Sequence, residues 1–497
     1  MRIFMFCIGN PTPIFETELE LIKKHQLQGD TVRVLQCTGN LANCLWNPEH
    51  LKSGCEMCRS RFKNGWSLLN TYERVELKHF PKNKPSFSDF TTEFKTVDEL
   101  KEYHYDGAKI GMGVASALIS MYRDHSFDTR KYRKMVSITL QSAIQVYNTL
   151  KFEFKEYKPD IVYIFNSRIT TQLPAVLLCE KMGIKYFTYE IATPWNCYTL
   201  RRNARIDNIE VVHQEIDILW GNGGYEREQT ARVWFEYNRN RVTVGMKVGY
   251  ITKEQEKGKL PESFDINKKN IAIFTSTLDE YVAVEGWENP LYQLFEAEGL
   301  YKILESFESN EKYIFYIRVH PRLMQASINC TQLKEFRVVS SNFPKAHFIW
   351  SDSLVDSYAL LDACEKIITF GSTIGIEAAY WGKPSILAGR AFYENFDCVY
   401  VPKTHEELVE LIKRDLAPLP AYSAMKYGFH AMSNGTPFKY FKQTGASTGL
   451  FNGVEIIPDP LPLSLKILLY LKKPTLILIK IQGWIQRLKE GIGTQKI

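Results

Sequence analysis

The chain has 497 residues, of which 45% are hydrophobic, and its 62 Lys and Arg residues nearly balance 56 Asp and Glu residues, leaving a net charge of +6. This length is sufficient for two or three domains with buried cores. A weak and dispersed charge excludes nucleic acid as the expected partner. Ten cysteines in so long a chain do not predict a disulfide scaffold.

The first residues, MRIFMFCIGNPTP, predict a β-strand rather than a secretory signal. They lack the long apolar core and the small-residue cleavage site of such a signal. The sequence has no uninterrupted run of about 18 apolar residues, so it predicts no helix that spans a membrane. We therefore expect a cytoplasmic protein.

Four cysteines, Cys37, Cys44, Cys55 and Cys58, follow the second expected strand in a C-x6-C-x10-C-x2-C arrangement. The C-x2-C pair is typical of metal chelation, but the wide first spacing matches no standard zinc finger. The alternative is four reduced and packed thiols. A redox role is disfavoured, because no βαβ element clearly begins at the C-x2-C pair.

Apolar, strand-like runs alternate with helix-like segments, which predicts parallel sheets wound with helices. The lysine-rich segment 253–270 separates two sets of strands and predicts a linker. The expected fold class is α/β, with two doubly wound, Rossmann-like domains facing a cleft. The expected domains are 1–252, 271–430 and a return segment with a tail at 431–497. Strands are expected at 2–9, 32–37, 161–167, 185–192, 270–277, 313–321, 366–373 and 384–389.

The acidic cluster in TSTLDE follows the first strand after the linker. Asp279 or Glu280 could act there as the general base for an acceptor hydroxyl. The alternative is a helix N-cap followed by acidic residues that favour the helix dipole. The sequence alone does not choose between the two carboxylates.

The next strand ends in IRVHPRL, which places Arg318, His320 and Arg322 together. Because proline disfavours the helical region for its predecessor, His320 is expected to be extended and aimed at the mouth of the cleft. Arginine offers a bidentate fork for phosphate. The alternative is an ordinary solvated strand end.

A third cluster, ITFGSTIGIEAA, ends a strand and opens a helix. The backbone amides at Ser372 and Thr373 could bind a phosphate, with Gly371 and Gly375 allowing a close approach. Glu377, one turn into the helix, could accept hydrogen bonds from ribose hydroxyls. The alternative is a plain βα turn with a solvated glutamate.

The order TLDE, HPR and FGSTIGIEAAYWGKPSILAG resembles bacterial capsular and surface polysaccharide biosynthesis glycosyltransferases of the two-Rossmann GT-B type. It is more loosely similar to bacterial sialyltransferases and capsule Kdo transferases. The N-terminal PDIVYIFNSR and GIKYFTYE are similar to strand ends of the surface-polysaccharide group. Ser167 stands where that pattern has glycine.

The resemblance implies a transfer of a sugar from a CMP- or UDP-linked donor to a glycan or lipid-linked acceptor, without a catalytic metal, since no Asp-x-Asp motif is present. It also favours a structural zinc at the cysteine quartet. The alternatives are a nucleotide-sugar epimerase of the same fold and a non-catalytic glycan-assembly protein. The implied roles are phosphate contact for His320, Ser372 and Thr373, nucleotide binding for Glu377, the base for Asp279 or Glu280, and an acceptor side formed by Asn166, Arg168 and Glu190.

The C-terminal tail, residues 461–497, carries seven basic residues against one acid, Glu490, and Pro474 is expected to divide it into two helices. An apolar face with lysines and a tryptophan suits an anionic membrane surface. We therefore expect peripheral contact with the inner face of the cell membrane. The alternative is a helix that packs back on the first domain. The residues of the apolar face are Ile477, Ile481, Trp484, Ile485 and Leu488.

Overall fold

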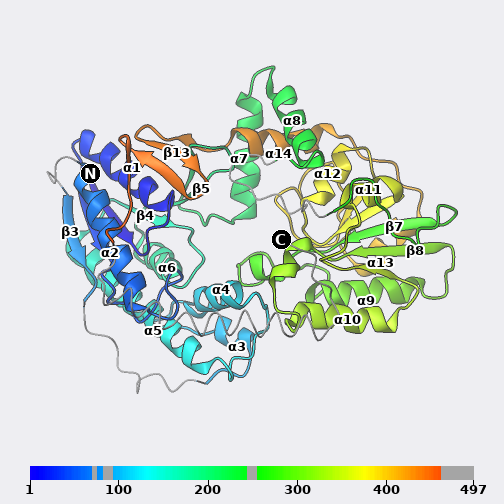
Figure 1. Ribbon diagram of the computed structural model, residues 1–497, viewed down its shortest axis with the longest axis horizontal. Helices are drawn as coiled ribbons and strands as arrows, with labels where there is room; N and C mark the ends of the chain where they lie inside the picture. The colour runs from blue at the N-terminus through cyan, green and yellow to red at the C-terminus, as the bar shows by residue number, and fades with distance from the viewer. Residues whose placement is uncertain (70–74, 82–92, 243–254, 461–497) are drawn as a thin grey trace.

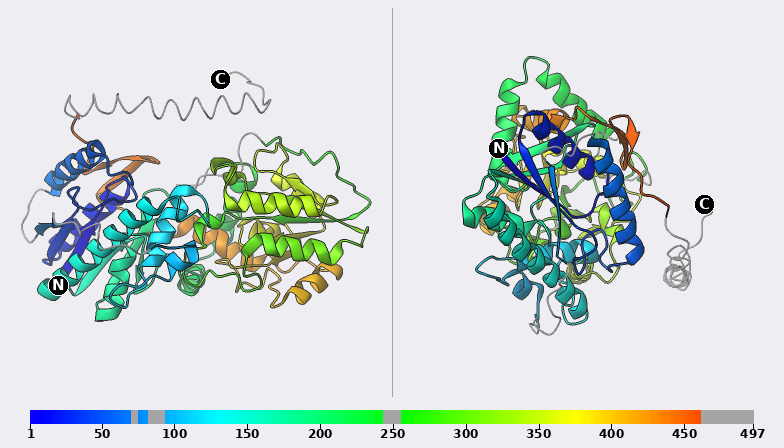
Figure 2. Two further views of the ribbon diagram at one scale, coloured as in Figure 1. Left: turned by 90° about the horizontal axis from the view of Figure 1, so that it is seen from below. Right: turned by 90° about the vertical axis from the view of Figure 1, so that its left-hand side faces the viewer.

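The structure is a computed structural model, and it describes residues 1–69, 75–81, 93–242 and 255–460. These residues form two α/β units that lie next to each other along the longest axis (Figures 1 and 2). Each unit is built on a sheet whose central strands are parallel and whose faces are covered by helices. The predicted fold class, with two doubly wound units, is confirmed.

The first unit contains a seven-stranded sheet with the order β12-β6-β5-β4-β1-β2-β3. β6 is antiparallel to its neighbours, and the other pairs are parallel. Its strands are β1 (Arg2–Cys7), β2 (Thr31–Gln36), β3 (Val75–His79), β4 (Ile161–Phe165), β5 (Tyr186–Ile191), β6 (Cys197–Arg202) and β12 (Thr436–Pro437). Its helices are α1 (Ile14–Leu27), α2 (Lys52–Trp66), α3 (Val97–Lys101), α4 (Gly111–Tyr122), α5 (Arg133–Tyr157) and α6 (Leu173–Met182).

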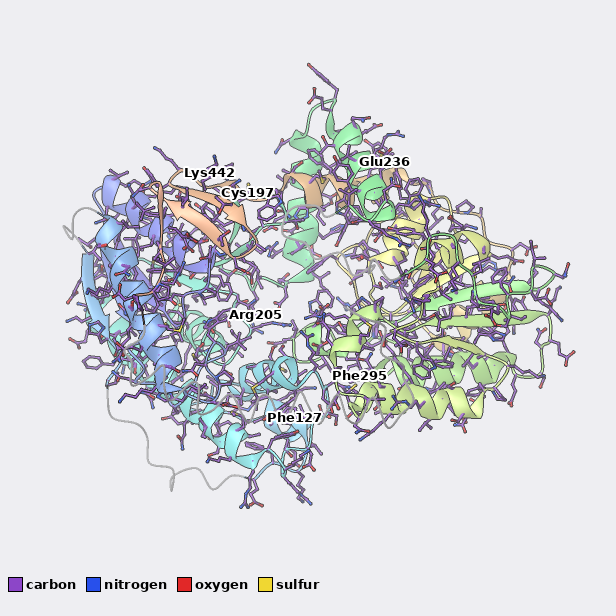
Figure 3. The ribbon with its side chains drawn as sticks, in the orientation of Figure 1. Phe127, Cys197, Arg205, Glu236, Phe295 and Lys442 are labelled. Carbon is purple, nitrogen blue, oxygen red and sulfur yellow. The ribbon has the colours of Figure 1, made fainter. Side chains whose placement is uncertain are left out.

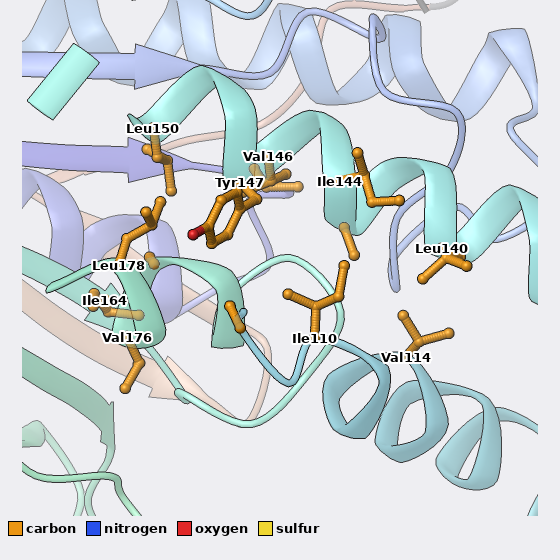
Figure 4. Close-up of a cluster of buried hydrophobic side chains, with 14 of the residues drawn as sticks. Ile110, Val114, Leu140, Ile144, Val146, Tyr147, Leu150, Ile164, Val176 and Leu178 are labelled. Atoms are coloured by element: carbon orange, nitrogen blue, oxygen red, sulfur yellow. The ribbon is translucent and has the colours of Figure 1, made fainter. Parts of the chain in front are cut away.

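The side chains of β1 point alternately to the two faces of this sheet, and this shows why both faces are covered. Phe4 and Phe6 belong to the core that α5 covers, whereas Ile3 and Met5 belong to the core on the opposite face. Successive strand residues point to opposite faces, so a strand that is apolar throughout needs a helix layer on each side. Figure 4 shows the α5 side, where this helix packs against α4 and α6.

The second unit contains a five-stranded, wholly parallel sheet with the order β11-β10-β7-β8-β9. Lys269 and Asn270, expected at the end of the linker, already belong to β7. The strands are β7 (Lys269–Phe274), β8 (Tyr313–Arg318), β9 (His347–Ile349), β10 (Lys366–Thr369) and β11 (Ser385–Leu387). The helices are α9 (Phe295–Phe307), α10 (Thr331–Asn342), α11 (Ser357–Ala363), α12 (Ile374–Tyr380) and α13 (His405–Lys413).

Three helices, α7 (Ile209–Asn222), α8 (Arg227–Arg239) and α14 (Tyr422–Ser433), pack together between the two sheets (Figure 1). Phe235 of α8 stacks on Tyr380 of α12 with ring centroids 3.8 Å apart. These helices therefore share a core with the second unit, although two of them precede it in the chain. The expected domain boundaries stay a prediction.

After α14 the chain returns to the first unit. β12 pairs with β6, and a small antiparallel sheet follows. The buried Glu20 of α1 accepts hydrogen bonds from the amides of Lys439 and Tyr440, at 2.9 and 2.8 Å. This carboxylate fixes the returning chain against α1. The small sheet consists of β13 (Phe441–Gly445), β14 (Thr448–Phe451) and β15 (Val454–Glu455).

Polar contacts join the two units along the line where they meet. The indole Nε1 of Trp287 donates to the carbonyl of Asp207 at 2.8 Å, and Arg205 pairs with Glu285 at 2.5 Å. Figure 3 shows Arg205 at this boundary. The contacts hold the segment that follows β6 against the second unit.

Across the described ranges, no helix has the length and apolar character needed to cross a membrane. The basic tail lies outside the described residues, so its expected membrane contact stays a prediction.

Candidate active site

The three polar clusters of the second unit meet at one edge of its sheet. They follow β10, β7 and β8, which are neighbours in that order. Phe274 at the end of β7 is in register with Thr369 of β10 and with Arg318 of β8, so the three strands end at the same level. The amide of His320 donates to Thr275 Oγ1 at 3.0 Å. Segments separated by about a hundred residues thus form one continuous edge, the position where open α/β sheets bind ligands.

His320 is extended, with φ −59° and ψ 128°, as its place before Pro321 predicts. Its Nδ1 accepts a hydrogen bond from the amide of Arg322 at 3.2 Å. Burial, together with the nearby Arg318 charge, lowers the pKa of His320 to about 4. The imidazole is therefore neutral at physiological pH and acts as a hydrogen-bonding group rather than a cation.

The two arginines of this cluster differ in orientation. Arg318 is 1% exposed, and its Nη1 donates to the carbonyl of Trp350 at 2.6 Å, with Nε near Ser357 Oγ at 3.4 Å. Arg322 instead pairs with Glu280. The structure therefore brings Arg322 to the strand-end edge and turns Arg318 into the protein.

At both glycines of the third cluster, Gly371 and Gly375, neighbouring atoms leave no room for a side chain. Gly371 has φ 146°, and a Cβ there would lie 2.7 Å from the carbonyl oxygen of Arg390. A Cβ on Gly375 would lie 2.5 Å from the hydroxyl of Tyr393. That hydroxyl also donates to the carbonyl of Ser372. Gly375 thus makes room for Tyr393, and not, as expected from the sequence, for a close approach by an anion.

Thr373 precedes α12 and makes no side-chain capping bond. In the part of the chain that the structure describes, the amides of Ser372, Thr373 and Ile374 donate no backbone hydrogen bond. Unpaired amides at the start of a helix are the groups that bind anions. Glu377 is 6% exposed and accepts a hydrogen bond from the hydroxyl of Tyr358.

The two candidate bases occupy different surroundings within the short 3₁₀ turn Leu278–Glu280. Asp279 is buried, and its Oδ2 lies 3.4 Å from Nη1 of Arg123 at the end of α4. Glu280 is exposed and pairs with Arg322. Asp279 therefore joins the turn to the first unit, whereas the Glu280 side chain stays accessible.

Glu296, in the first turn of α9, holds the residues that flank the 3₁₀ turn Leu278–Glu280. It was not identified from the sequence. Its carboxylate accepts from the amide of Ser276 at 2.7 Å, from Gln332 Nε2 at 3.0 Å and from the hydroxyl of Tyr281 at 3.3 Å. Burial raises the pKa of Glu296 to about 8. Two donors that flank the Leu278–Glu280 turn and one from α10 thus converge on one buried side chain.

The residues predicted to form the acceptor side lie at the carboxyl ends of β4 and β5. Asn166 and Ser167 have φ values of 59° and 72°, a region that favours glycine. Ser167 is held there because its Oγ accepts from the amide of Ile206 at 3.0 Å. Asn166 Nδ2 donates to Glu190 Oε2 at 2.7 Å. This geometry explains how serine occupies the position where the resembling pattern has glycine.

Arg168 links the two sets of predicted residues. Its guanidinium donates to the carbonyl of Glu280 in the second unit. Burial lowers the pKa of Arg168, against the opposing effect of the Asp207 and Glu190 carboxylates. Burial also raises the pKa of Glu190. The acceptor-side residues therefore face the strand-end edge of the second unit across this arginine.

The cysteine quartet lies in the first unit. Burial raises the pKa of the Cys44 thiol to about 12, and nearby Cys37 adds to the shift. Among the residues that the structure describes, no three His, Cys, Asp or Glu side chains are grouped to hold a metal ion. Burial, with contributions from the nearby Cys37, Cys44 and Cys55, also raises the pKa of Cys58, so the four thiols lie near one another, and the structural zinc stays a hypothesis.

Metal analysis of the purified chain checks this hypothesis. If the quartet holds zinc, the protein carries about one zinc per chain, and chelation lowers its melting temperature. Cys58→Ser then loses the metal, whereas Cys197→Ser, outside the quartet, keeps it. If protein never exposed to a chelator contains only background zinc, the four cysteines are reduced and packed thiols rather than a metal site.

Comparisons with known proteins bear on the second unit. Residues 286–397 match the family model described as capsule polysaccharide biosynthesis protein. The match includes the His-Pro and Gly-Ser-Thr clusters and begins after Asp279 and Glu280. A search of curated proteins gave no significant match.

Solved structures with some likeness include transferases and epimerases. The beta Kdo 2,4 transferase of Thermosulfurimonas dismutans KpsC is 13% identical, with 54% of this chain and 79% of that chain covered and a TM-score of 0.35. The UDP-GlcNAc 2-epimerase from Neisseria meningitidis is 13% identical, with 88% and 96% covered and a TM-score of 0.26. The spinosyn rhamnosyltransferase SpnG is 10% identical, with 87% and 96% covered and a TM-score of 0.25. At these TM-scores the likenesses carry no conclusion about activity. The family match over 286–397 confirms the predicted resemblance of this chain to capsule polysaccharide biosynthesis proteins.

Proposed function

We propose that this protein is a GT-B type glycosyltransferase that moves a sugar from a nucleotide-sugar donor to a capsule or surface polysaccharide acceptor. The observation that carries the proposal is the meeting of three polar clusters at the ends of β10, β7 and β8, two of them inside the family match. Transfer needs a phosphate site, an acceptor site and a base within one space. The two units supply candidates for each along their shared boundary.

The donor phosphate would lie against the amides of Ser372, Thr373 and Ile374 and the hydroxyls of Ser372 and Thr373, with His320 beside them. The neutral imidazole would give a hydrogen bond to the leaving phosphate, and Arg322 would supply positive charge. No step in this proposal requires a metal ion. Transfer measured in the presence of a chelator checks that metal independence.

The chemical step would deprotonate an acceptor hydroxyl as its oxygen attacks the anomeric carbon of the donor. The bond from that carbon to the phosphate oxygen breaks, and the nucleotide leaves with the electron pair. We assign the base to Glu280, because its side chain is exposed beside Arg322 and Arg168 contacts its carbonyl. Asp279 would hold the turn against α4 through Arg123.

Nucleotide titration of the full chain tests the phosphate site, after a thermal-shift screen with CMP, CDP, UDP and GDP. His320→Ala and Ser372→Ala should each weaken binding of the selected nucleotide by about 1–3 kcal/mol, the loss for a charge-assisted hydrogen bond. His347→Ala, on the edge strand β9 and outside the three strand-end clusters, is the matched control and should bind normally. Unchanged affinity in both site variants would remove these residues from the donor site.

A further inference from the structure

A cavity of about 490 Å³ lies beside Glu190, and its lining includes no residue of the three strand-end clusters. β5, β6, α7, α14 and the loop after β11 contribute its lining. The volume falls within the range of about 300–1,000 Å³ that small-molecule sites occupy. Its lining combines polar side chains with two aromatic rings, Phe392 and Tyr427.

The charges around this cavity disfavour a phosphate. Glu190 contributes a carboxylate to the lining. Arg201, 7% exposed, is bound by the Glu215 carboxylate, with Nη2 to Oε2 at 2.8 Å, and donates to the Ile206 carbonyl. Its positive charge is therefore compensated within the protein. A nucleotide phosphate would meet the Glu190 carboxylate without a free cation to balance it.

The remaining polar groups offer a ligand both a hydrogen-bond donor, His430, and an acceptor, Asn434. Burial and the nearby Arg201 charge lower the pKa of His430 to about 4, so its ring is neutral. Its Nδ1 lies 3.4 Å from Asn434 Nδ2. Within the described ranges, the buried Oδ1 of Asn434 has no hydrogen-bond partner. Buried polar atoms are almost always paired, so this oxygen is the acceptor of the lining that still lacks a donor.

The apolar part of the lining completes the match to one ligand class. Phe392 is fixed by an edge-on contact with Trp287, with ring centroids 5.0 Å apart, and Tyr427 packs edge-on against Tyr393 at 6.1 Å. A sugar ring has apolar C–H faces and a rim of hydroxyls. Aromatic walls with polar groups between them match both features, whereas an acyl chain would leave the Asn434 Oδ1 oxygen unpaired.

We propose that this cavity binds a sugar ring of the acceptor glycan. That this sugar belongs to the acceptor rests on the proposed transferase function, whereas binding of a sugar ring is inferred from the lining residues alone. Two contacts place the cavity beside the donor edge. Tyr393, next to Phe392 in the chain, bonds the carbonyl of Ser372, and Arg168, charge-coupled to Glu190, contacts Glu280.

Ligand-observed saturation-transfer NMR on the full chain tests the inference with neutral, N-acetylated and carboxylated methyl pyranosides. At least one should bind, and both His430→Phe and Glu190→Gln should weaken it at least tenfold. His213→Phe makes the same exchange on α7 outside the lining and should leave binding unchanged. Melting temperatures of all three variants establish that they are folded. Absence of pyranoside binding to the wild type, or binding that survives both cavity variants, would overturn the inference.

Nucleotide titrations of the same variants distinguish a failure of this inference from a failure of the proposed function. Both cavity variants should bind the bare nucleotide and its nucleotide-sugar as tightly as the wild type. If His430→Phe weakens only the nucleotide-sugar, the cavity holds the donor sugar and the acceptor inference is wrong. If pyranosides bind in the cavity but no nucleotide binds, the transferase proposal fails and the sugar site stands. If a nucleotide binds but no pyranoside binds in the cavity, the sugar site is wrong and the transferase proposal stands.

Discussion

Glu280→Gln should lower the rate of sugar transfer by about 10²–10⁴-fold, the usual contribution of a general base. The change removes the proton acceptor but keeps the size of the side chain and its backbone contact with Arg168. Nucleotide affinity should not fall, because the amides at Ser372 and Thr373 are untouched and the Arg322 charge is no longer paired with Glu280. Single-turnover transfer and nucleotide titration on the same sample measure both quantities.

Asp279→Asn is the matched comparison in the same turn. It loses part of the Arg123 ion pair, so we expect a lower melting temperature and a rate within about tenfold of the wild type. A full loss of transfer in Asp279→Asn with normal transfer in Glu280→Gln would reverse the assignment of the base.

Glu296→Ala should lower the free energy of unfolding by about 3 kcal/mol, because it leaves three buried donors without their acceptor. It should also slow transfer, since the Ser276 amide that it holds leads directly into the turn of Glu280. Glu305→Ala, exposed on the same helix, should change stability by less than about 0.5 kcal/mol. Urea unfolding of the three proteins measures the difference.

The pH dependence of stability gives a second measure of Glu296. Its pKa is raised to about 8 in the fold by burial, so between its ordinary value and pH 8 the native state binds more protons than the unfolded chain. Stability therefore falls as pH rises through this window. Glu296→Gln should flatten that slope between pH 6.5 and 8. An equal slope in both proteins would show that Glu296 does not titrate there.

The sequence was sufficient to predict the fold class and the three strand-end clusters, because apolar runs that end in glycine, hydroxyl or His-Pro groups mark parallel strands. It could not give the strand order. That β10, β7 and β8 are neighbours depends on long-range pairing, and only this order makes His320 and Thr275 adjacent. Tyr393 follows the end of β11, so the same rule applied to that strand could have identified it.

Arg318 and Glu296 show where sequence patterns are insufficient. Arg318 is the last residue of β8, so its side chain falls on a sheet face covered by α11, whereas His320 lies beyond the strand. Glu296 looks like an ordinary first-turn acid. Only the approach of Ser276 and Gln332 from other segments makes it a buried acceptor.

The most direct test of the central claim is mass-spectrometric detection of transfer by the purified full chain. The chain is incubated with the nucleotide-sugar of the nucleotide that it binds and with capsular oligosaccharides. The account predicts a product longer by one sugar and an equal amount of released nucleotide, both lost in Glu280→Gln. Conversion of the donor to an epimer without any acceptor, or nucleotide binding with neither transfer nor hydrolysis of any nucleotide-sugar, would contradict it.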